Sequence, residues 1–296
     1  MARFGRVLTA MVTPFGADGR LDLDVARRLA RFLVDQGNDG LVIAGTTGES
    51  AVLTDDEKLS LWAAVAEAVT VPVIAGTGSN DTAHSVHLTK EVAHLGLAGV
   101  LVVTPYYNRP SQRGLDGHFR AVAAATDLPV IIYDIPIRTG RKVSSALLGT
   151  LSREVPNILA LKDAAGNPAE TASVIASARS GFEVYSGDDG LTLPLLAVGA
   201  VGVIGVATHW SASDHVEMIT SFEKGDVSTA RAVNARLLPS FAYETGDDAP
   251  NPVPTKAMMR VMGIAVGECR LPMGVAPDWV EPRARQVLAD LQAARG

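Results

Sequence analysis

The feature of this sequence that most restricts its fold is a short apolar segment, rich in β-branched residues, that recurs along the chain. The starts of these segments are spaced by roughly 20 to 33 residues, about the length of one strand–helix unit. We predict eight buried strands from them, at Val7–Val12, Gly40–Ala44, Val73–Gly76, Val100–Thr104, Val130–Tyr133, Ile158–Lys162, Glu183–Ser186 and Val201–Val206.

The stretches between these segments are typical of helices. After Asp22, apolar residues recur at helical spacing up to Gly37, and Thr54 with Glu57 forms a capping-box pattern ahead of the next stretch. Nearly continuous apolar strands that alternate with helices indicate a parallel sheet covered on both faces. Eight such units predict an α/β protein with a (β/α)8 TIM barrel, whereas an open doubly wound sheet fits that number less well.

The chain continues after the eighth strand for longer than one barrel helix requires. Three further helical patterns occur, at Val227–Leu238, Pro254–Met262 and Pro277–Ala294. We therefore predict a barrel over residues 1–225 and a C-terminal helical extension over residues 226–296.

Composition excludes several classes of partner. The formal net charge is −6, and no cluster of Lys and Arg residues is present to bind nucleic-acid phosphates. No uncharged apolar run reaches the roughly 18 residues of a membrane span, and Met1–Arg6 lacks a signal-peptide pattern. A single cysteine, Cys269, excludes a disulfide framework. We expect a cytoplasmic protein with no nucleic-acid or membrane partner.

Polar residues follow the predicted strands, where barrel enzymes carry their functional side chains. The segments are Gly45–Ser50, Gly76–Asn80, Thr104–Pro110, Tyr133–Pro136, Lys162–Asp163 and Ser186–Asp189. Because the carboxyl ends of parallel strands meet at one rim, hydroxyl groups, an ammonium group and the guanidinium of Arg138 are expected to converge there.

Lys162 is the most informative of these residues, because it closes the apolar run Ile158–Leu161. Burial disfavours the ammonium form and favours a neutral amine that attacks a carbonyl. The alternative is a lysine that pairs with Asp163 or extends to water. Two tyrosines and a threonine on the same rim favour a Schiff-base nucleophile.

Tyr133 precedes Lys162 by one strand, so its phenol is expected to transfer protons during imine formation. Thr47 and Tyr107 are candidates for a relay, since each hydroxyl both donates and accepts. Arg138 offers a bidentate site for a carboxylate. The alternative for each tyrosine is a core aromatic residue whose hydroxyl already has a hydrogen-bond partner. The alternative for Arg138 is a surface ion pair.

Two weaker patterns point to a metal or a cofactor. His84, His87, Glu91 and His94 fall on one helical stripe, which is also what a solvent-exposed barrel helix presents. Gly76–Gly78 follows a strand but lacks the third glycine of a dinucleotide-binding turn. We expect neither a metal nor an organic cofactor.

The ordered motifs resemble those of the dihydrodipicolinate synthase / N-acetylneuraminate lyase family of class I aldolases. The matching segments are Gly45–Ser50, Tyr106–Pro110, Tyr133–Pro136, Lys162–Asp163 and Ser186–Asp189, and the resemblance runs from about Val7 to Pro272. It implies that Lys162 forms an imine with pyruvate and that the derived enamine attacks L-aspartate 4-semialdehyde. Tyr133 would transfer protons through Thr47 and Tyr107.

The resemblance also implies binding residues and an assembly. Thr46 and Thr47 would hold the pyruvate carboxylate and Arg138 that of the semialdehyde, while the Gly187 carbonyl and Ile204 line the pocket. A neighbouring subunit would supply Tyr107, so the expected assembly is a homotetramer built as a dimer of dimers.

Within the family, Arg138, the Tyr106–Tyr107 pair, Asn251–Pro254 and Arg270–Pro272 favour the members that use this aldehyde. Relatives that act on a sugar acid generally lack the arginine and are the first alternative. A barrel that only binds a small keto acid and a metal-dependent aldolase are two others.

Regulation is expected to differ from that of lysine-inhibited relatives. Those relatives place a histidine or glutamate where this chain has Lys58, and an acidic residue where it has His84. Asn80 and Tyr106 are retained. A cationic Lys58 would repel the ammonium group of an incoming lysine, and His84 removes a carboxylate partner. We therefore predict weak or absent inhibition by lysine.

Overall fold

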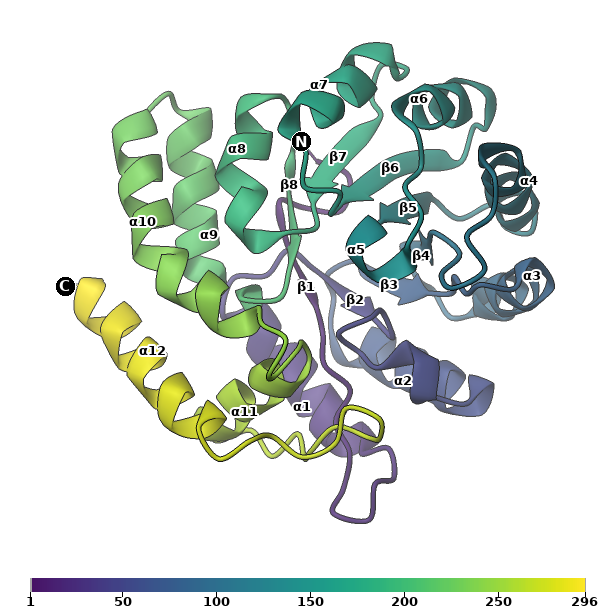
Figure 1. Ribbon diagram of the computed structural model, residues 1–296. Coiled ribbons are helices and arrows are strands. Elements are labelled where there is room, and N and C mark those ends of the chain that lie inside the picture. Colours follow the sequence, from purple (N-terminus) through teal and green to yellow (C-terminus); the bar gives the residue numbers. More distant parts are fainter. Residues whose placement is uncertain (1, 296) are drawn as a thin grey trace. The chain divides into compact units, whose positions relative to one another are not determined.

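The computed structural model describes residues 2–295, and its strands confirm the predicted barrel (Figure 1). Eight parallel strands are hydrogen-bonded in chain order and close into a barrel. They are β1 (Val7–Ala10), β2 (Gly40–Ile43), β3 (Val73–Gly76), β4 (Gly99–Val103), β5 (Val130–Asp134), β6 (Ile158–Asp163), β7 (Glu183–Ser186) and β8 (Gly202–Gly205). Residues 1 and 296, which the predicted domain ranges include, lie outside the described residues, and the boundary at residue 225 stays a prediction.

Helices follow the strands as the sequence predicts, and the expected caps are present. The Asp22 side chain accepts a hydrogen bond from the first turn of α1, and Thr54 with Glu57 forms the capping box of α2. The helices are α1 (Leu23–Asp35), α2 (Asp55–Ala68), α3 (Thr82–Glu91), α4 (Gln112–Ala123), α5 (Pro136–Thr139), α6 (Ser145–Glu154), α7 (Pro168–Ser177), α8 (Thr192–Ala197), α9 (Thr208–Glu223), α10 (Val227–Glu244), α11 (Val253–Val261) and α12 (Val280–Ala294), with short 3-10 turns η1 (Ser50–Val52), η2 (Val92–His94) and η3 (Asp189–Leu191).

The chain separates into two compact units, and the first holds the strands from β3 onward. Unit 1 comprises the described residues up to Arg6 together with Pro72–Ile204. Its strands pair in parallel from β3 to β8, and the Arg6 carbonyl accepts a hydrogen bond of 2.8 Å from the Val203 N–H. Helices between these strands cover the sheet, as the apolar strands require.

Unit 2 comprises Val7–Val71 and the chain from Gly205 onward. It contains the parallel pair β1–β2 and, side by side, the helices α9, α10 and α12 (Figure 1). The helix α10 extends six residues beyond the predicted end at Leu238 and includes Pro239. Burial of Phe241 and Tyr243 offsets the hydrogen bond that the proline removes, and this tertiary term is absent from the local pattern.

A buried histidine in unit 1 makes folding sensitive to acid. His118 in α4 is 4% exposed, with its Nδ1 3.0 Å from the Thr82 hydroxyl and its ring against Phe119. Its Nε2 has no hydrogen-bond partner among residues 2–295. Burial lowers the pKa of His118 to about 4, although the nearby Asp81 carboxylate opposes the shift. The folded protein therefore holds this imidazole neutral.

We predict that the buried, neutral His118 makes the folded protein less stable as the pH falls from about 6.5 to 4. In that interval the unfolded histidine binds a proton and the folded one does not, so the free energy of unfolding should fall by up to about 3 kcal/mol. Urea unfolding at several pH values should show the difference between the wild type and His118→Gln shrinking with acidification. The exposed His87→Gln is the control, and a pH-independent difference for His118→Gln would contradict the prediction.

Candidate active site

Tyr133 and Lys162 lie side by side at the ends of β5 and β6 in unit 1. They are register partners, and the Lys162 Nζ lies 4.4 Å from the centre of the Tyr133 ring. Both side chains are buried, with Tyr133 5% and Lys162 4% exposed. The structure therefore brings the predicted nucleophile and the predicted proton-transfer residue into contact.

An irregularity in the β5–β6 ladder produces this pairing. The register shifts between Val130 and Ile131, so that β6 contributes one extra residue ahead of Lys162. Without it, Tyr133 would pair with Leu161. Because strand side chains alternate, Lys162 would then lie on the opposite face of the sheet from Tyr133. The apolar pattern of the sequence contains no signal for this shift.

Gly187, directly after β7, lies against the stem of Lys162. A Cβ atom on Gly187 would be 2.9 Å from the Lys162 Cγ and 3.0 Å from its Cε, which is closer than carbon atoms approach. The Gly187 N–H donates to the Asp163 carbonyl at 2.7 Å and holds the turn in place. A glycine is needed here because the lysine passes so close to the backbone.

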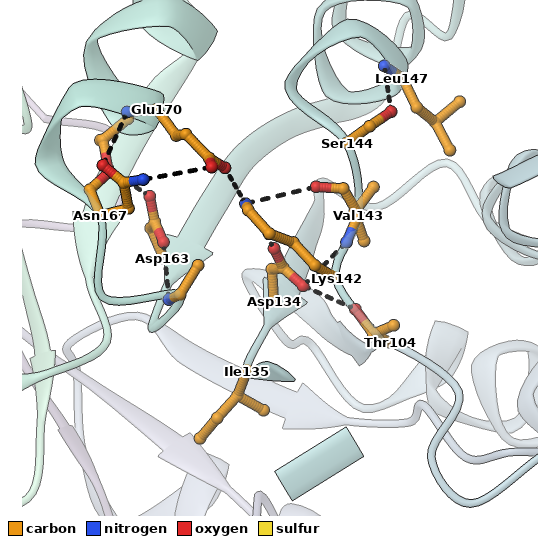
Figure 2. Close-up of polar contacts among 12 residues, drawn as sticks. Thr104, Asp134, Ile135, Lys142, Val143, Ser144, Leu147, Asp163, Asn167 and Glu170 are labelled. Atoms are coloured by element: carbon orange, nitrogen blue, oxygen red, sulfur yellow. Dashed lines mark hydrogen bonds and ion pairs between the residues drawn. The ribbon is translucent and has the colours of Figure 1, made fainter. Parts of the chain in front are cut away.

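Asp134 and Asp163 follow the central pair and form a second one on the outer face. They are register partners, and adjacent strand residues point to opposite faces. Asp134 is 1% exposed and accepts a hydrogen bond of 3.1 Å from the Val143 N–H (Figure 2). Burial raises the pKa of Asp134 to about 6, although the nearby Lys142 ammonium opposes the shift. Sequence reasoning missed this carboxylate pair, although strand alternation was its signal.

The Thr46–Thr47 segment follows β2 in unit 2, and a distant amide holds it. Thr47 is 3% exposed, and its hydroxyl accepts a hydrogen bond of 2.9 Å from the Asn251 Nδ2. The Asn251 Oδ1 accepts in turn from the Thr255 hydroxyl at 3.0 Å. Thr46 is half-buried. Local patterns cannot reveal the contact between Thr47 and Asn251, because they lie far apart in the chain.

A second buried lysine supports the same segment of unit 2. Lys256 is fully buried, with its Nζ 2.6 Å from the Glu49 Oε1 and 3.0 Å from the Glu268 carbonyl. Burial lowers the pKa of Lys256, while the Glu49 carboxylate acts in the opposite direction. Glu49 adopts a left-handed φ of 56° and also accepts the Arg270 N–H at 2.9 Å. Lys256 is therefore half of an ion pair that anchors the Thr46–Thr47 segment.

Three other predicted residues of unit 1 differ in exposure. Arg138 is exposed on the short helix α5, which ends at Gly140 with a left-handed φ of 69°. Tyr107 is 90% exposed with a φ of 74°, so its side chain is not part of the buried pair. Ile204 is fully buried in β8.

The histidine stripe does not form a metal site in the described structure. His87 Nδ1 lies 4.0 Å from Glu91 Oε1, and the 3-10 turn η2 begins directly after Glu91. Within residues 2–295, no group of three or more His, Cys, Asp or Glu side chains is arranged to hold a metal ion. Over the same residues, no helix has the length and apolar character needed to cross a membrane.

The fold and this site define a class of enzyme. A (β/α)8 barrel with a buried lysine beside a tyrosine, on its sixth and fifth strands, is that of a class I aldolase-type lyase. A sequence model of the Dihydrodipicolinate synthetase family matches residues 3–291. The chain belongs to this family.

Relatives and a solved structure agree with this assignment. The 4-hydroxy-tetrahydrodipicolinate synthase of Moorella thermoacetica is 50% identical over 275 residues, covering 92% of each chain. The enzyme of the same name from Thermosynechococcus vestitus is 46% identical over 98% of each chain. A crystal structure of the synthase from Cyanidioschyzon merolae with lysine bound superposes with a TM-score of 0.96, at 42% identity and 99% coverage of both chains.

We predict that Gly187→Ala displaces Lys162 and slows reaction with a keto acid by roughly 10- to 100-fold, the order expected for a misplaced reacting group. The methyl group would overlap the lysine stem. Borohydride trapping of the imine, followed over time by mass spectrometry, measures the effect. Gly117→Ala is the matched control, because a Cβ there meets nothing within 4 Å. Equal trapping rates for both variants would refute the prediction.

Proposed function

We propose that this chain condenses pyruvate with L-aspartate 4-semialdehyde to give 4-hydroxy-tetrahydrodipicolinate, in lysine and diaminopimelate biosynthesis. The observation that carries the proposal is the buried Lys162 amine, 4.4 Å from the Tyr133 ring. The names of the relatives support this reaction over cleavage of a sugar acid.

The chemistry begins at Lys162. Its Nζ attacks C2 of pyruvate, and the former ketone oxygen leaves as water once it has been protonated, which leaves an imine. Tyr133 donates that proton. Loss of a proton from the pyruvate methyl group gives an enamine, whose carbon bonds to the aldehyde carbon of the semialdehyde. The amino group of that substrate then displaces Lys162, which closes the ring and frees the amine.

Other residues bind the substrates in this proposal. Thr46 and Thr47 take the pyruvate carboxylate, and Thr47 also passes protons between Tyr133 and the solvent with Tyr107. The Thr47 hydroxyl accepts from Asn251, so its own proton is directed to another acceptor. The Gly187 carbonyl and Ile204 line the pyruvate pocket.

Arg138 takes the carboxylate of the aldehyde substrate. A planar guanidinium binds a carboxylate through two parallel hydrogen bonds, which a sugar-acid substrate does not require at this place. The exposure of Arg138 on α5 suits a residue that meets a second substrate arriving from solvent.

The proposed assembly is a homotetramer, a dimer of dimers, in the cytoplasm. Tyr107 supports it: an aromatic side chain that is 90% exposed on a left-handed backbone gains apolar burial if it enters the site of a neighbouring copy. The relay would then be complete only in the oligomer.

We predict that borohydride with pyruvate labels Lys162 and leaves Lys256 unlabelled. The Lys256 ammonium is held by Glu49, whereas the Lys162 amine is the proposed nucleophile. Peptide mapping by mass spectrometry locates the adduct. Lys162→Ala should abolish it, and Tyr133→Phe should slow its formation by about 10²- to 10³-fold. A pyruvate-dependent adduct at another lysine, or none on folded protein, would overturn the mechanism. Turnover with the semialdehyde, and none with a sugar aldehyde, decides between the two substrates.

We also predict that L-lysine at low-millimolar concentration leaves the rate unchanged. Lys58 is buried, with its Nζ 3.7 Å from Asp55. By the resemblance drawn from the sequence, it stands where lysine-inhibited relatives have a histidine or glutamate. The Cyanidioschyzon merolae protein, crystallised with lysine bound, is the comparison. A lysine titration of the wild type and of Lys58→His with His84→Glu should show inhibition only in the double variant. Inhibition of the wild type in this range would contradict the prediction.

A further inference from the structure

A buried carboxylate closes the base of the loop that carries Arg138. This loop, residues 135–144, leaves β5 directly after Asp134 and leads into α6. The Asp134 Oδ1 accepts hydrogen bonds from the Val143 N–H at 3.1 Å and the Thr104 hydroxyl at 3.4 Å (Figure 2). Asp134 therefore joins the two ends of the loop and ties them to the end of β4.

Lys142 supplies the positive charge at this carboxylate. Its Nζ lies 3.4 Å from the Asp134 Oδ2 and 2.9 Å from the Glu170 Oε2, and Figure 2 shows it between the two acids. Asp163, the register partner of Asp134, adds a third negative charge and accepts the Thr171 hydroxyl at 2.6 Å. One ammonium thus faces acids from β5, β6 and α7, and without it Asp134 would be a buried, uncompensated charge.

The loop is also held by Arg109, in the segment after β4, and by Gln112, at the start of α4. Arg109 Nε donates to the Gly140 carbonyl at 3.0 Å, and Gln112 Nε2 donates to the Lys142 carbonyl at 2.8 Å. Gln112 Oε1 also accepts the Ser144 N–H at 2.9 Å. Loosening the charged base would therefore shift the loop and Arg138, while the β5–β6 ladder that aligns Tyr133 and Lys162 keeps its own hydrogen bonds.

We propose that Lys142 is a positioning residue for the second substrate: by neutralising Asp134 it holds loop 135–144 in the arrangement that presents Arg138 to the carboxylate of the aldehyde. The inference rests on the proposed role of Arg138. It assigns Lys142 to aldehyde binding and leaves imine formation to residues that the loop does not carry.

The test separates the two substrates. Lys142→Met keeps most of the apolar stem and removes the charge, so the KM for aspartate semialdehyde should rise about 5- to 20-fold. The rate of borohydride-trapped adduct formation with pyruvate alone should stay within about twofold. Lys142→Arg restores a cation and should return the KM to within about threefold of the wild type. Thermal unfolding of each variant reports whether it is folded.

A double variant tests the charge argument itself. In Lys142→Met with Asp134→Asn, the amide at position 134 still accepts the Val143 N–H and needs no counter-ion. The double variant should therefore recover at least half of the lost affinity for the aldehyde. If the increase in KM of the double variant is instead the product of the increases in the two single variants, Lys142 acts only through packing and the proposal is wrong.

The pH profile gives a further readout. Asp134 has a pKa of about 6, and removal of the Lys142 ammonium would raise it further. In Lys142→Met the ionised Asp134 lacks its counter-ion, and protonation removes this penalty as the Asp134→Asn substitution does. The loss of kcat/KM for the semialdehyde relative to the wild type should therefore be largest above the pKa of Asp134, shrink at lower pH, and lose this pH dependence in the double variant. A loss in Lys142→Met that is the same at all pH values would oppose the proposal.

Two controls keep the conclusions distinct. Lys90→Met, at an exposed lysine in the last turn of α3, should change neither the KM for pyruvate nor the KM for aspartate semialdehyde. Arg138→Leu tests the underlying function alone. If that variant leaves the KM for the semialdehyde unchanged, the proposed function of Arg138 fails whatever Lys142 does. If Arg138→Leu raises it and Lys142→Met does not, the positioning role alone fails.

Discussion

The register of β5 against β6 is the constraint on which the chemistry of this protein depends. It makes Tyr133 and Lys162 neighbours on one face and Asp134 and Asp163 neighbours on the other. A single extra residue in β6 sets this register, and a slip by one residue would exchange the two faces of that strand. The amine and the phenol would then be separated by the sheet itself.

The two faces of the β5–β6 pair have different roles: one carries the proposed reacting groups, and the other carries charged groups that hold the neighbouring loop. The inner pair is buried and in direct contact, which suits an amine that forms a covalent bond. The outer pair is charged and needs compensation, which Lys142 and backbone N–H groups provide. Tyr133 and Lys162, proposed to act on pyruvate, are each followed in the chain by an aspartate of the outer pair. Through that pair, strand alternation connects them to loop 135–144, which is proposed to bind the aldehyde.

Lys162 and Lys256 show why a buried lysine is not by itself a nucleophile. Lys256 is more deeply buried than Lys162, yet its amine lies 2.6 Å from the Glu49 carboxylate, which favours the ammonium. Lys162 lies over the phenol ring of Tyr133. The carboxylate partner that favours the charged form of Lys256 comes from some 200 residues away in the chain.

The sequence by itself determined the eight strands, their order, the caps of the first helices and the candidate residues at the strand ends, because these features follow from periodicity and side-chain chemistry within a few residues. Only the tertiary structure decided the end of α10, the β5–β6 register, the contact of Asn251 with Thr47, and the ion pairs of Lys142 and Lys256. Most of these join segments distant in the chain. The free energy of these contacts comes from burial and pairing that local patterns do not contain. The motifs therefore predicted the reacting groups, and the packed structure determined which residues contact them.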